Sequence, residues 1–446
     1  MPIEGFTLGR GKTQTERRIM AKSLTAGVVD LNGQIRGKRF PVAKREVLER
    51  DGFRMPVSLM GVDIWGRDAE GSKLVFETGD ADGKVVPTDR GPVITQLGDR
   101  EEVFLPCMLY TDDDAPFTAD PRQALVKVTQ AFAARGLTPV VATELEFYLT
   151  DPKKIYATSL RSNRILDEYN MVSIEELDQV GPFLDGLYAV CEAQGIPADT
   201  AISENGEGQF EINLKHVADP LRAADDAVLF KRAVKAVAKH HKLAATFMAK
   251  PFMDRSGNGL HVHFSLLNAA GDNIFNLDTP QGLPNLKDAI AGCLDAMPNC
   301  MAVFAPHQNS YRRFAAHSHA PSAIAWGMEN RTTAMRIPGG PAVATRIEHR
   351  VSGADANPYL VLAAVLQSAL DGLDTKEQPP APVEGDAYSQ DLPQLPTNWP
   401  QALHLFENAP FDPLLIHAFT EAKKQEIERF FADISAFEYR TYLDHA

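Results

Sequence analysis

The chain has 446 residues, of which 44% are hydrophobic and 23% are charged, and it carries a formal net charge of −14. This length exceeds what one ordinary core needs, so we expect one large domain and one smaller domain. The negative charge disfavours nucleic acid and anionic membrane surfaces as partners, and no apolar run approaches the roughly 20 residues that span a bilayer. The start of the chain lacks a signal-peptide core and the cysteines lack CxxC spacing, which predicts reduced thiols in a cytoplasmic protein; they are Cys107, Cys191, Cys293 and Cys300.

Residues 1–116 predict a small N-terminal domain of short strands and turns. Two strands are expected to flank Asn32-Gly33, because this dipeptide favours the two-residue type I′ turn of a hairpin. Further short strands are expected at residues 57–64, 74–76 and 103–105. The acidic run at residues 112–114 indicates a solvated loop and places the domain boundary near Pro116.

Residues 117–446 predict a larger domain in which helices and strands mix. Three helices are expected to begin at an Asp or Asn followed by Pro, because the first caps a helix and Pro suits its first turn; the pairs are Asp120-Pro121, Asp219-Pro220 and Asn357-Pro358. The first of these helices should end at Gly136. Without regular βαβ alternation, the expected class is α+β. The sequence has neither a Walker loop nor a GxGxxG fingerprint, so ATP would need other phosphate ligands.

Four predicted strands carry unusual polar residues on one face. Side chains at i and i+2 share a face of a strand. The polar sets are Glu144 and Glu146; Gln209, Glu211 and Asn213; His261, His263 and Ser265; and Arg346, Glu348 and Arg350. Each strand alone is compatible with a face that is merely exposed to solvent. Together they favour a curved sheet whose polar concave face binds metal ions, because adjacent carboxylates repel each other unless a cation lies between them.

The residue types indicate the chemistry of this face. Several carboxylates with a histidine form a hard, oxygen-rich ligand set that suits Mg²⁺ or Mn²⁺. Two such ions could polarise a transferring phosphoryl group and orient its acceptor. Arginines could clamp the phosphates in place of a glycine-rich loop; the candidates are Arg331, Arg336 and Arg346.

Six ordered motifs resemble those of glutamine synthetases. They are ATELEFYL (142–149), ENGEGQFEINL (204–214), GNGLHVHFSL (257–266), NSYRRF (309–314), NRTTAMRIP (330–338) and RIEHR (346–350) followed by ANPYL (356–360). The resemblance covers residues 120–373, with a weaker beginning at VDLNGQIRGKRFP. It implies an N-terminal β-grasp domain and a larger catalytic domain whose curved antiparallel sheet forms an active-site funnel. It also implies a homo-oligomer, a dodecamer of two hexameric rings, in which the N-terminal domain of a neighbour completes each site.

The resemblance assigns roles to the residues whose motifs match. Two or more divalent ions would be bound, one by Glu146, Glu204 and Glu211, and the other by Glu144, His261 and Glu348. The glutamate substrate would contact Gly257, Arg313, Arg331 and Arg350. ATP would contact His263, Ser265, Arg331, Arg336 and Arg346, with Arg331 also acting in catalysis.

The part of the site that handles ammonium departs from the glutamine synthetase pattern. Where that family has a glutamate on a flap over the ammonium site, this chain has His319. The asparagine expected before Gly257 is Ser256. Asp63 is the nearest candidate for the acidic residue of the ammonium site. His319 and Asp63 are therefore the candidate catalytic residues on the amine side.

With its metal, nucleotide and glutamate residues intact, the sequence resembles the branch that makes γ-glutamylated amines, such as γ-glutamylpolyamine synthetases and the related methylamine ligase. The resemblance implies that ATP phosphorylates the γ-carboxylate of glutamate and that a polyamine or small alkylamine then displaces the phosphate. A glutamine synthetase that uses ammonia is the alternative, and a non-catalytic structural member of the superfamily is a remote one. The identity of the amine is left open.

Overall fold

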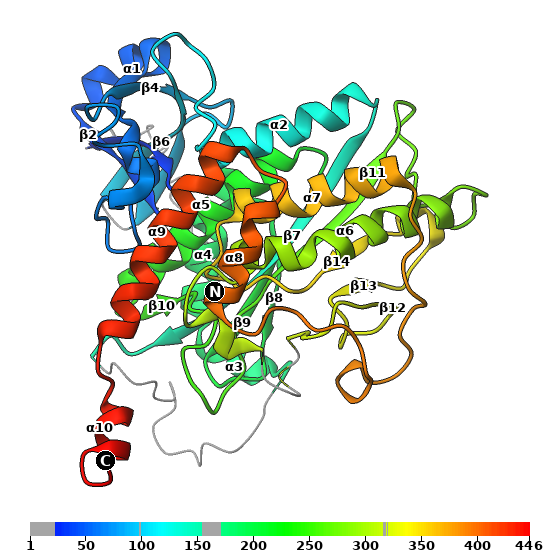
Figure 1. Cartoon of the computed structure of the whole chain (residues 1–446). Helices are drawn as coiled ribbons and strands as arrows, with labels where there is room; N and C mark the ends of the chain where they lie inside the picture. The colour runs from blue at the N-terminus through cyan, green and yellow to red at the C-terminus, as the bar shows by residue number, and fades with distance from the viewer. Residues whose placement is uncertain (1–22, 98–99, 154–170, 315–317, 319) are drawn as a thin grey trace, which may run out of the picture.

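The computed structural model describes residues 23–97, 100–153, 171–314, 318 and 320–446. It contains a small sheet near the N-terminus and a larger sheet in the rest of the chain, and helices cover one face of the larger sheet (Figure 1). The predicted α+β class is confirmed. Within the described residues, no helix combines the length and the apolar character that crossing a bilayer requires.

The N-terminal sheet has the strand order β2-β1-β6-β4-β3, and β5 pairs with β6. Its elements are β1 (Ser23–Val29), β2 (Ile35–Phe40), α1 (Arg45–Asp51), β3 (Phe53–Pro56), β4 (Asp82–Pro87), β5 (Val93–Leu97) and β6 (Arg100–Tyr110). The pair β1 and β6 is parallel, whereas the other pairs are antiparallel. This small mixed sheet with one short helix agrees with the β-grasp domain expected.

The hairpin between β1 and β2 forms, but the predicted two-residue turn is wrong. The Asp30 N–H donates to the Gln34 carbonyl at 2.9 Å, which leaves a three-residue loop whose last residue, Gly33, has a φ of +73°. This is a type I turn followed by one left-handed residue. The wider loop is stabilised by the Asp30 carboxylate, which accepts the N–H groups of Asn32 and Gln34 at 2.9 and 2.8 Å.

Of the three further strands predicted, only residues 103–105 lie in a strand, β6. Val57–Gly61 form a 3-10 helix, and residues 74–76 form bends and turns. The 3-10 helix packs against α9 (Pro413–Ala432). A contact between distant parts of the chain therefore overrides the strand preference of its Val and Leu residues.

The larger sheet has the strand order β12-β13-β14-β11-β7-β9-β8, and β10 pairs with β7. Its strands are β7 (Thr138–Thr150), β8 (Ala198–Ser203), β9 (Gln209–Val217), β10 (Ala244–Thr246), β11 (Leu260–Leu267), β12 (Trp326–Met328), β13 (Met335–Ile337) and β14 (Ile347–His349). Every pair is antiparallel except β12 and β13. The division into domains 1–116 and 117–446 would assign the two sheets to different domains, and it stays a proposal.

The three helices predicted from Asx-Pro pairs are confirmed. They are α2 (Pro121–Ala134), α5 (Pro220–His240) and α7 (Pro358–Thr375), capped by Asp120, Asp219 and Asn357. Gly136 follows the end of α2 with a φ of +67°. The remaining α-helices of the described chain are α3 (Ile174–Gln179), α4 (Gly181–Gln194), α6 (Gly282–Phe304), α8 (Trp399–Leu405), α9 and α10 (Ala436–Tyr442).

One face of the larger sheet is apolar and packs against the helices. Phe147 of β7, Phe210 of β9 and Phe264 of β11 are at most 1% exposed, and Phe147 contacts the ring of Phe230 on α5. Because alternate residues of a strand point to opposite faces, this packing turns the polar residues of the same strands to the other face. The core therefore sets the register of the site.

Candidate active site

The four polar strands are neighbours in the larger sheet, in the order β14, β11, β7 and β9. Their registers place polar residues directly opposite one another, in the pairs His261–Glu144, His263–Glu348 and Glu146–Glu211. Opposite residues of paired strands share a face of the sheet. The prediction that the four polar sets lie on one face is therefore confirmed.

This face lines a cavity of about 680 Å³, which we call the funnel. The lining includes five predicted metal ligands, namely Glu144, Glu146, Glu204, Glu211 and His261. It also includes every arginine assigned to substrate or phosphate, namely Arg313, Arg331, Arg336, Arg346 and Arg350. Gly257 and His263 line it as well, whereas the sixth ligand, Glu348, is buried with 1% exposure.

Glu144 lies between the two histidines of β11. Its carboxylate is 3.1 Å from His261 Nδ1 and 2.9 Å from His263 Nε2. Burial alone would raise the pKa of Glu144, but the hydrogen bonds with both imidazoles outweigh burial and hold that pKa well below its ordinary value. Possible ligand atoms lie within 4.8 Å of one another in two groups, Glu144 with Glu211 and His261, and Glu144 with His263 and Glu348. The geometry therefore also brings His263, assigned from the sequence to the nucleotide, next to the predicted metal ligands.

The carboxylates on the other side of the funnel are close enough to repel one another. Burial, followed by the charge of Glu146, raises the pKa of Glu204 to about 7. Burial and the charges of Glu144 and Glu146 raise the pKa of Glu211 well above its ordinary value. Glu146 is held in place because it accepts the Gly259 N–H at 2.6 Å. A divalent cation stabilises carboxylates arranged in this way, so the donor set fits Mg²⁺ or Mn²⁺.

Two of the arginines contact the buried Glu348, and a third is free of carboxylates. Arg350 and Arg336 both form ion pairs with Glu348, the second at 2.9 Å. Burial raises the pKa of Glu348, but the charges of Arg350 and the histidines outweigh it and lower that pKa to about 2. Arg313 is 4% exposed and donates to the Val351 carbonyl at 2.7 Å. No carboxylate of the described chain pairs with Arg313, so its guanidinium is available for a substrate carboxylate.

The loop at Gly257 approaches Arg313 so closely that only glycine fits. A Cβ atom at Gly257 would lie 2.5 Å from the Ala249 carbonyl oxygen and 2.8 Å from Arg313 Cγ. These distances are too short for any side chain. Gly257 therefore lets the backbone reach the place where the resemblance predicts the glutamate substrate.

Gln209 connects the metal ligands to this loop. Its Nε2 donates to Gly257 O and Asn258 Oδ1, both at 3.0 Å, and lies 3.4 Å from Glu146 Oε2. Its Oε1 accepts the Gly206 N–H at 3.1 Å. Since Gln209 is 1% exposed, its hydrogen bonds are shielded from water. Gln209 thus positions a predicted metal ligand and the predicted glutamate loop relative to each other.

Besides Glu348, the predicted residues Ser265 and Asp63 do not line the funnel described. Ser265 lies further along β11, and His319 is outside the described residues. Asp63 is 1% exposed and lies elsewhere, where it accepts the Trp65 N–H at 2.9 Å and Gln425 Nε2 at 2.8 Å. The role of Asp63 on the amine side stays a prediction, and it would require the funnel of a neighbouring subunit.

The structure adds Glu329 to the funnel lining. Its carboxylate lies 3.1 Å from Arg336 Nη2, and its φ of +53° is uncommon for a residue with a side chain. Glu329 directly follows β12, outside any alternating pattern. Strand periodicity therefore could not identify Glu329 as a funnel residue.

A curved, mainly antiparallel sheet that carries clustered carboxylates, imidazoles and guanidinium groups, beside a small mixed sheet, is the arrangement of the glutamine synthetase class. The glutamine synthetase catalytic domain family matches residues 118–442. The chain belongs to this family.

Similar proteins include ligases that act on amines. The chain is 39% identical to γ-glutamylputrescine synthetase PuuA of Escherichia coli (strain K12), over 94% of this chain and 91% of that protein. It is 30% identical to glutamate–isopropylamine ligase of a Pseudomonas species, over 95% of each protein. A solved structure described as apo GmaS without ligand matches with a TM-score of 0.82 and 29% identity, over 95% of this chain and 97% of that one. Within the superfamily, the chain therefore groups with the γ-glutamylamine ligases.

Proposed function

We propose that this chain is an ATP-dependent ligase that joins the γ-carboxylate of glutamate to an amine through γ-glutamyl phosphate. The observation that carries this proposal is the funnel, in which clustered carboxylates and histidines face five arginines. The similar proteins named for putrescine and isopropylamine support an alkylamine as the acceptor.

Two or more divalent ions, Mg²⁺ or Mn²⁺, would be held by Glu144, Glu146, Glu204, Glu211, His261 and Glu348. The donor chemistry supports this, because the ligands are mainly carboxylates, and burial together with their mutual repulsion raises the pKa of Glu204 and Glu211. Such ions would stabilise the negative charge of the phosphoryl group during its transfer.

The residues of the chain hold the reactants. Arg313 and Arg350 would bind the glutamate carboxylates beside the backbone of Gly257, and Arg331 would contact both glutamate and phosphate. The nucleotide would contact His263, Ser265, Arg331, Arg336 and Arg346. Phosphorylation converts a poorly electrophilic carboxylate into an acyl phosphate, and attack by a neutral amine then releases phosphate. Fixed guanidinium groups stabilise the charge on the transferring phosphoryl oxygens.

The acceptor is the point at which this chain departs from glutamine synthetases. His319 stands where their flap glutamate is expected, so it offers no permanent negative charge to ammonium. An alkylamine gains about 0.8 kcal/mol for each buried CH₂, or roughly fourfold in affinity. A glutamine synthetase that uses ammonia is the second candidate. The retained ligand set argues against a non-catalytic structural protein, because unpaired like charges in a buried site destabilise a fold.

The enzyme would act on glutamate, ATP and an amine in the cytoplasm, as a homo-oligomer built from two hexameric rings. Asp63 does not line the funnel of its own chain, so a role on the amine side would require a neighbouring subunit. Light scattering combined with an activity assay tests this point. A monomer with full activity would refute the shared site.

An amine panel tests the proposed reaction directly. Phosphate release is measured with glutamate, Mg·ATP and either ammonia, methylamine, ethanolamine or putrescine. We expect at least one alkylamine to exceed ammonia in kcat/KM by about tenfold or more. If ammonia is the best acceptor, the chain is a glutamine synthetase with an altered flap.

A further inference from the structure

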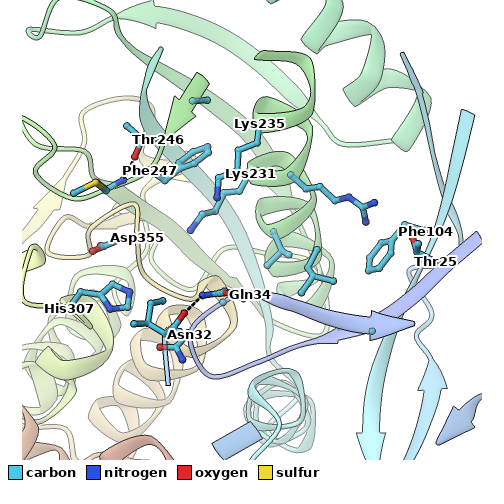
Figure 2. Close-up of a pocket in the computed structure, with 18 of the residues that line it drawn as sticks. Thr25, Asn32, Gln34, Phe104, Lys231, Lys235, Thr246, Phe247, His307 and Asp355 are labelled. Carbon is cyan, nitrogen blue, oxygen red and sulfur yellow. Dashed lines mark hydrogen bonds between the residues drawn. The ribbon is translucent and has the colours of Figure 1, made fainter. Parts of the chain in front are cut away.

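A second cavity, of about 920 Å³, lies between the N-terminal sheet and the larger domain. Figure 2 shows it bordered by the β1–β2 hairpin, by α5 and by the segment that follows β10. We call it the hairpin cavity. Among the described residues, none lines both this cavity and the funnel. It is therefore a space separate from the funnel of the same chain.

The hairpin cavity is basic, although the chain as a whole carries a net charge of −14. One carboxylate, Asp355, appears in its described lining, together with five cationic residues, namely Lys38, Arg39, Lys231, Arg232 and Lys235. Two of the cations are engaged elsewhere, because Lys38 donates to the Arg54 carbonyl at 2.7 Å and Arg232 lies 3.7 Å from Glu102. Arg39, Lys231 and Lys235 remain, and the two lysines share one face of α5.

Lys231 and Lys235 extend from one face of α5 into the cavity (Figure 2). They are one helical turn apart, and their Nζ atoms lie 5.4 and 5.8 Å from the centroid of the same ring, Phe247. Lys231 Nζ donates to the carbonyl oxygens of Ala354 and Ala356 at 2.7 and 3.2 Å. Within the described chain, no carboxylate forms an ion pair with either lysine.

Such a pair costs stability unless an opposite charge lies nearby. Like charges four residues apart on a helix repel each other. Burial, followed by the charge of Lys235, lowers the pKa of Lys231 to about 7, and the charge of Asp355 opposes this only in part. Lys235 is the more exposed of the two lysines, and partial desolvation lowers its pKa as well. The arrangement is the inverse of the funnel, where clustered carboxylates mark the place of a cation.

We propose that the hairpin cavity binds a small organic anion, with its phosphate or carboxylate group between Lys231 and Lys235 and its apolar part against Phe247. Ammonium groups are common partners of both acidic groups. The Thr246 hydroxyl accepts the Met248 N–H at 3.2 Å and keeps its own proton to donate to the anion. Phe247, which is 4% exposed, and the exposed Met248 both line the cavity and offer apolar contacts to a ring or short carbon chain.

An anion in this position would connect two regions of the chain. The cavity lining includes Gln34 of the hairpin, whose Nε2 donates to the Ile64 carbonyl at 3.0 Å. Ile64 is adjacent to Asp63, the candidate residue of the amine side. Binding should therefore stabilise the contact between the hairpin and α5, and it should raise the melting temperature of the folded chain.

Titration calorimetry on the full chain with Mg²⁺ tests this site, with phenyl phosphate and benzoate as probes that share a ring and differ in the acidic group. Lys235→Met removes one charge and keeps the apolar stem. Lys239→Met is the matched control, because Lys239 is exposed on the same helix and does not line the cavity. Arg346→Met reports any binding in the funnel.

We expect at least one probe to bind the wild type, Lys239→Met and Arg346→Met with equal affinity, and Lys235→Met at least about tenfold more weakly. That probe should raise the melting temperature of the wild type but not of Lys235→Met. Equal binding to Lys235→Met, loss of binding in Arg346→Met, or no binding of either probe to the wild type would overturn the proposal. The better of the two probes shows whether the site prefers phosphate or carboxylate.

Discussion

The funnel and the hairpin cavity hold clusters of opposite charge, and they are built differently. The funnel takes most of its carboxylates from alternate positions of paired strands, such as Glu144 and Glu146 on β7. The hairpin cavity takes its lining from a hairpin, a helix and loops that lie far apart in the sequence. Repeated spacing within one strand is visible in a sequence, whereas a cluster assembled from separate elements is not.

In both cavities, the fold holds like charges together at a cost in stability. Burial and carboxylate repulsion raise the pKa of Glu211, and burial and the charge of Lys235 lower the pKa of Lys231. A buried ion pair elsewhere gives the contrast, because Lys423 on α9 lies 3.0 Å from Glu426 and is fully partnered. Removing one charge should therefore have opposite effects on stability in the clustered sites and in the paired one.

The largest effect is expected from Glu211→Gln in the funnel. It removes a predicted metal ligand, so kcat/KM should fall by at least about 1,000-fold. Burial and neighbouring charges raise the pKa of Glu211. Above the ordinary pKa of a glutamate, the unfolded chain therefore ionises this residue more readily than the folded chain does, and the free energy of unfolding falls. Without added metal at pH 7, the variant should melt no lower than the wild type.

Glu428→Gln, at an exposed site on α9, is the control. Near-normal turnover of Glu211→Gln would exclude the metal role.

Lys423→Met should show the reverse pattern. It leaves Glu426, which is 0% exposed, as a buried charge with only His307 and the Ile64 N–H beside it, and the cost is expected to be roughly 3–5 kcal/mol in the free energy of unfolding. Lys424→Met, which breaks an exposed pair with Glu421, should cost less than about 1 kcal/mol. Denaturant unfolding measures both variants, and equal losses would contradict the distinction.

The same pair predicts a pH dependence of stability. Burial would raise the pKa of Glu426, but the charge of Lys423 and the interaction with His307 outweigh burial and lower it. The stabilisation is therefore present above pH about 4.5 and is lost as the pH falls through the lowered pKa. The advantage of the wild type over Lys423→Met should shrink below pH about 4.5. A constant difference down to pH about 3 would show that the pair contributes no titrating charge.

Gln209→Met tests the role of hydrogen bonds in the funnel, because it removes them without changing a charge. It leaves Gly257 O and the Gly206 N–H without their partner, at an expected cost of about 1–3 kcal/mol. The KM for glutamate should rise about tenfold or more. Gln394→Met, at an exposed position, should leave both quantities unchanged. Loss of stability with an unchanged KM would make Gln209 a purely structural residue.

The smallest effect concerns the amine. His319→Glu restores the negative charge expected on the flap of a glutamine synthetase, so the ratio of alkylamine to ammonia kcat/KM should fall several-fold, by up to about tenfold. His319→Gln, which is neutral, is the control. An unchanged ratio in His319→Glu would show that this position does not set the preference between amines.

Much of the funnel could be predicted because local rules act on neighbouring residues. The Asx-Pro pairs fixed the starts of α2, α5 and α7, since capping depends on adjacent side chains. Two-residue periodicity placed Glu144 and Glu146 on one face, and the core behind β7 maintains that face. The type I′ turn at Asn32-Gly33 was wrong because the Asp30 carboxylate stabilises a wider loop.

The residue types of the site, the faces of its strands and the resemblance to glutamine synthetases could all be derived from the order of the amino acids. Three features required the folded chain: the four polar strands are neighbours, Gln209 connects Glu146 to the loop at Gly257, and two lysines of α5 face a cavity closed by the hairpin. The physical reason is the distance along the chain over which each interaction acts. Capping and strand alternation act over a few residues, whereas strand order and cavity walls depend on how distant apolar surfaces pack together.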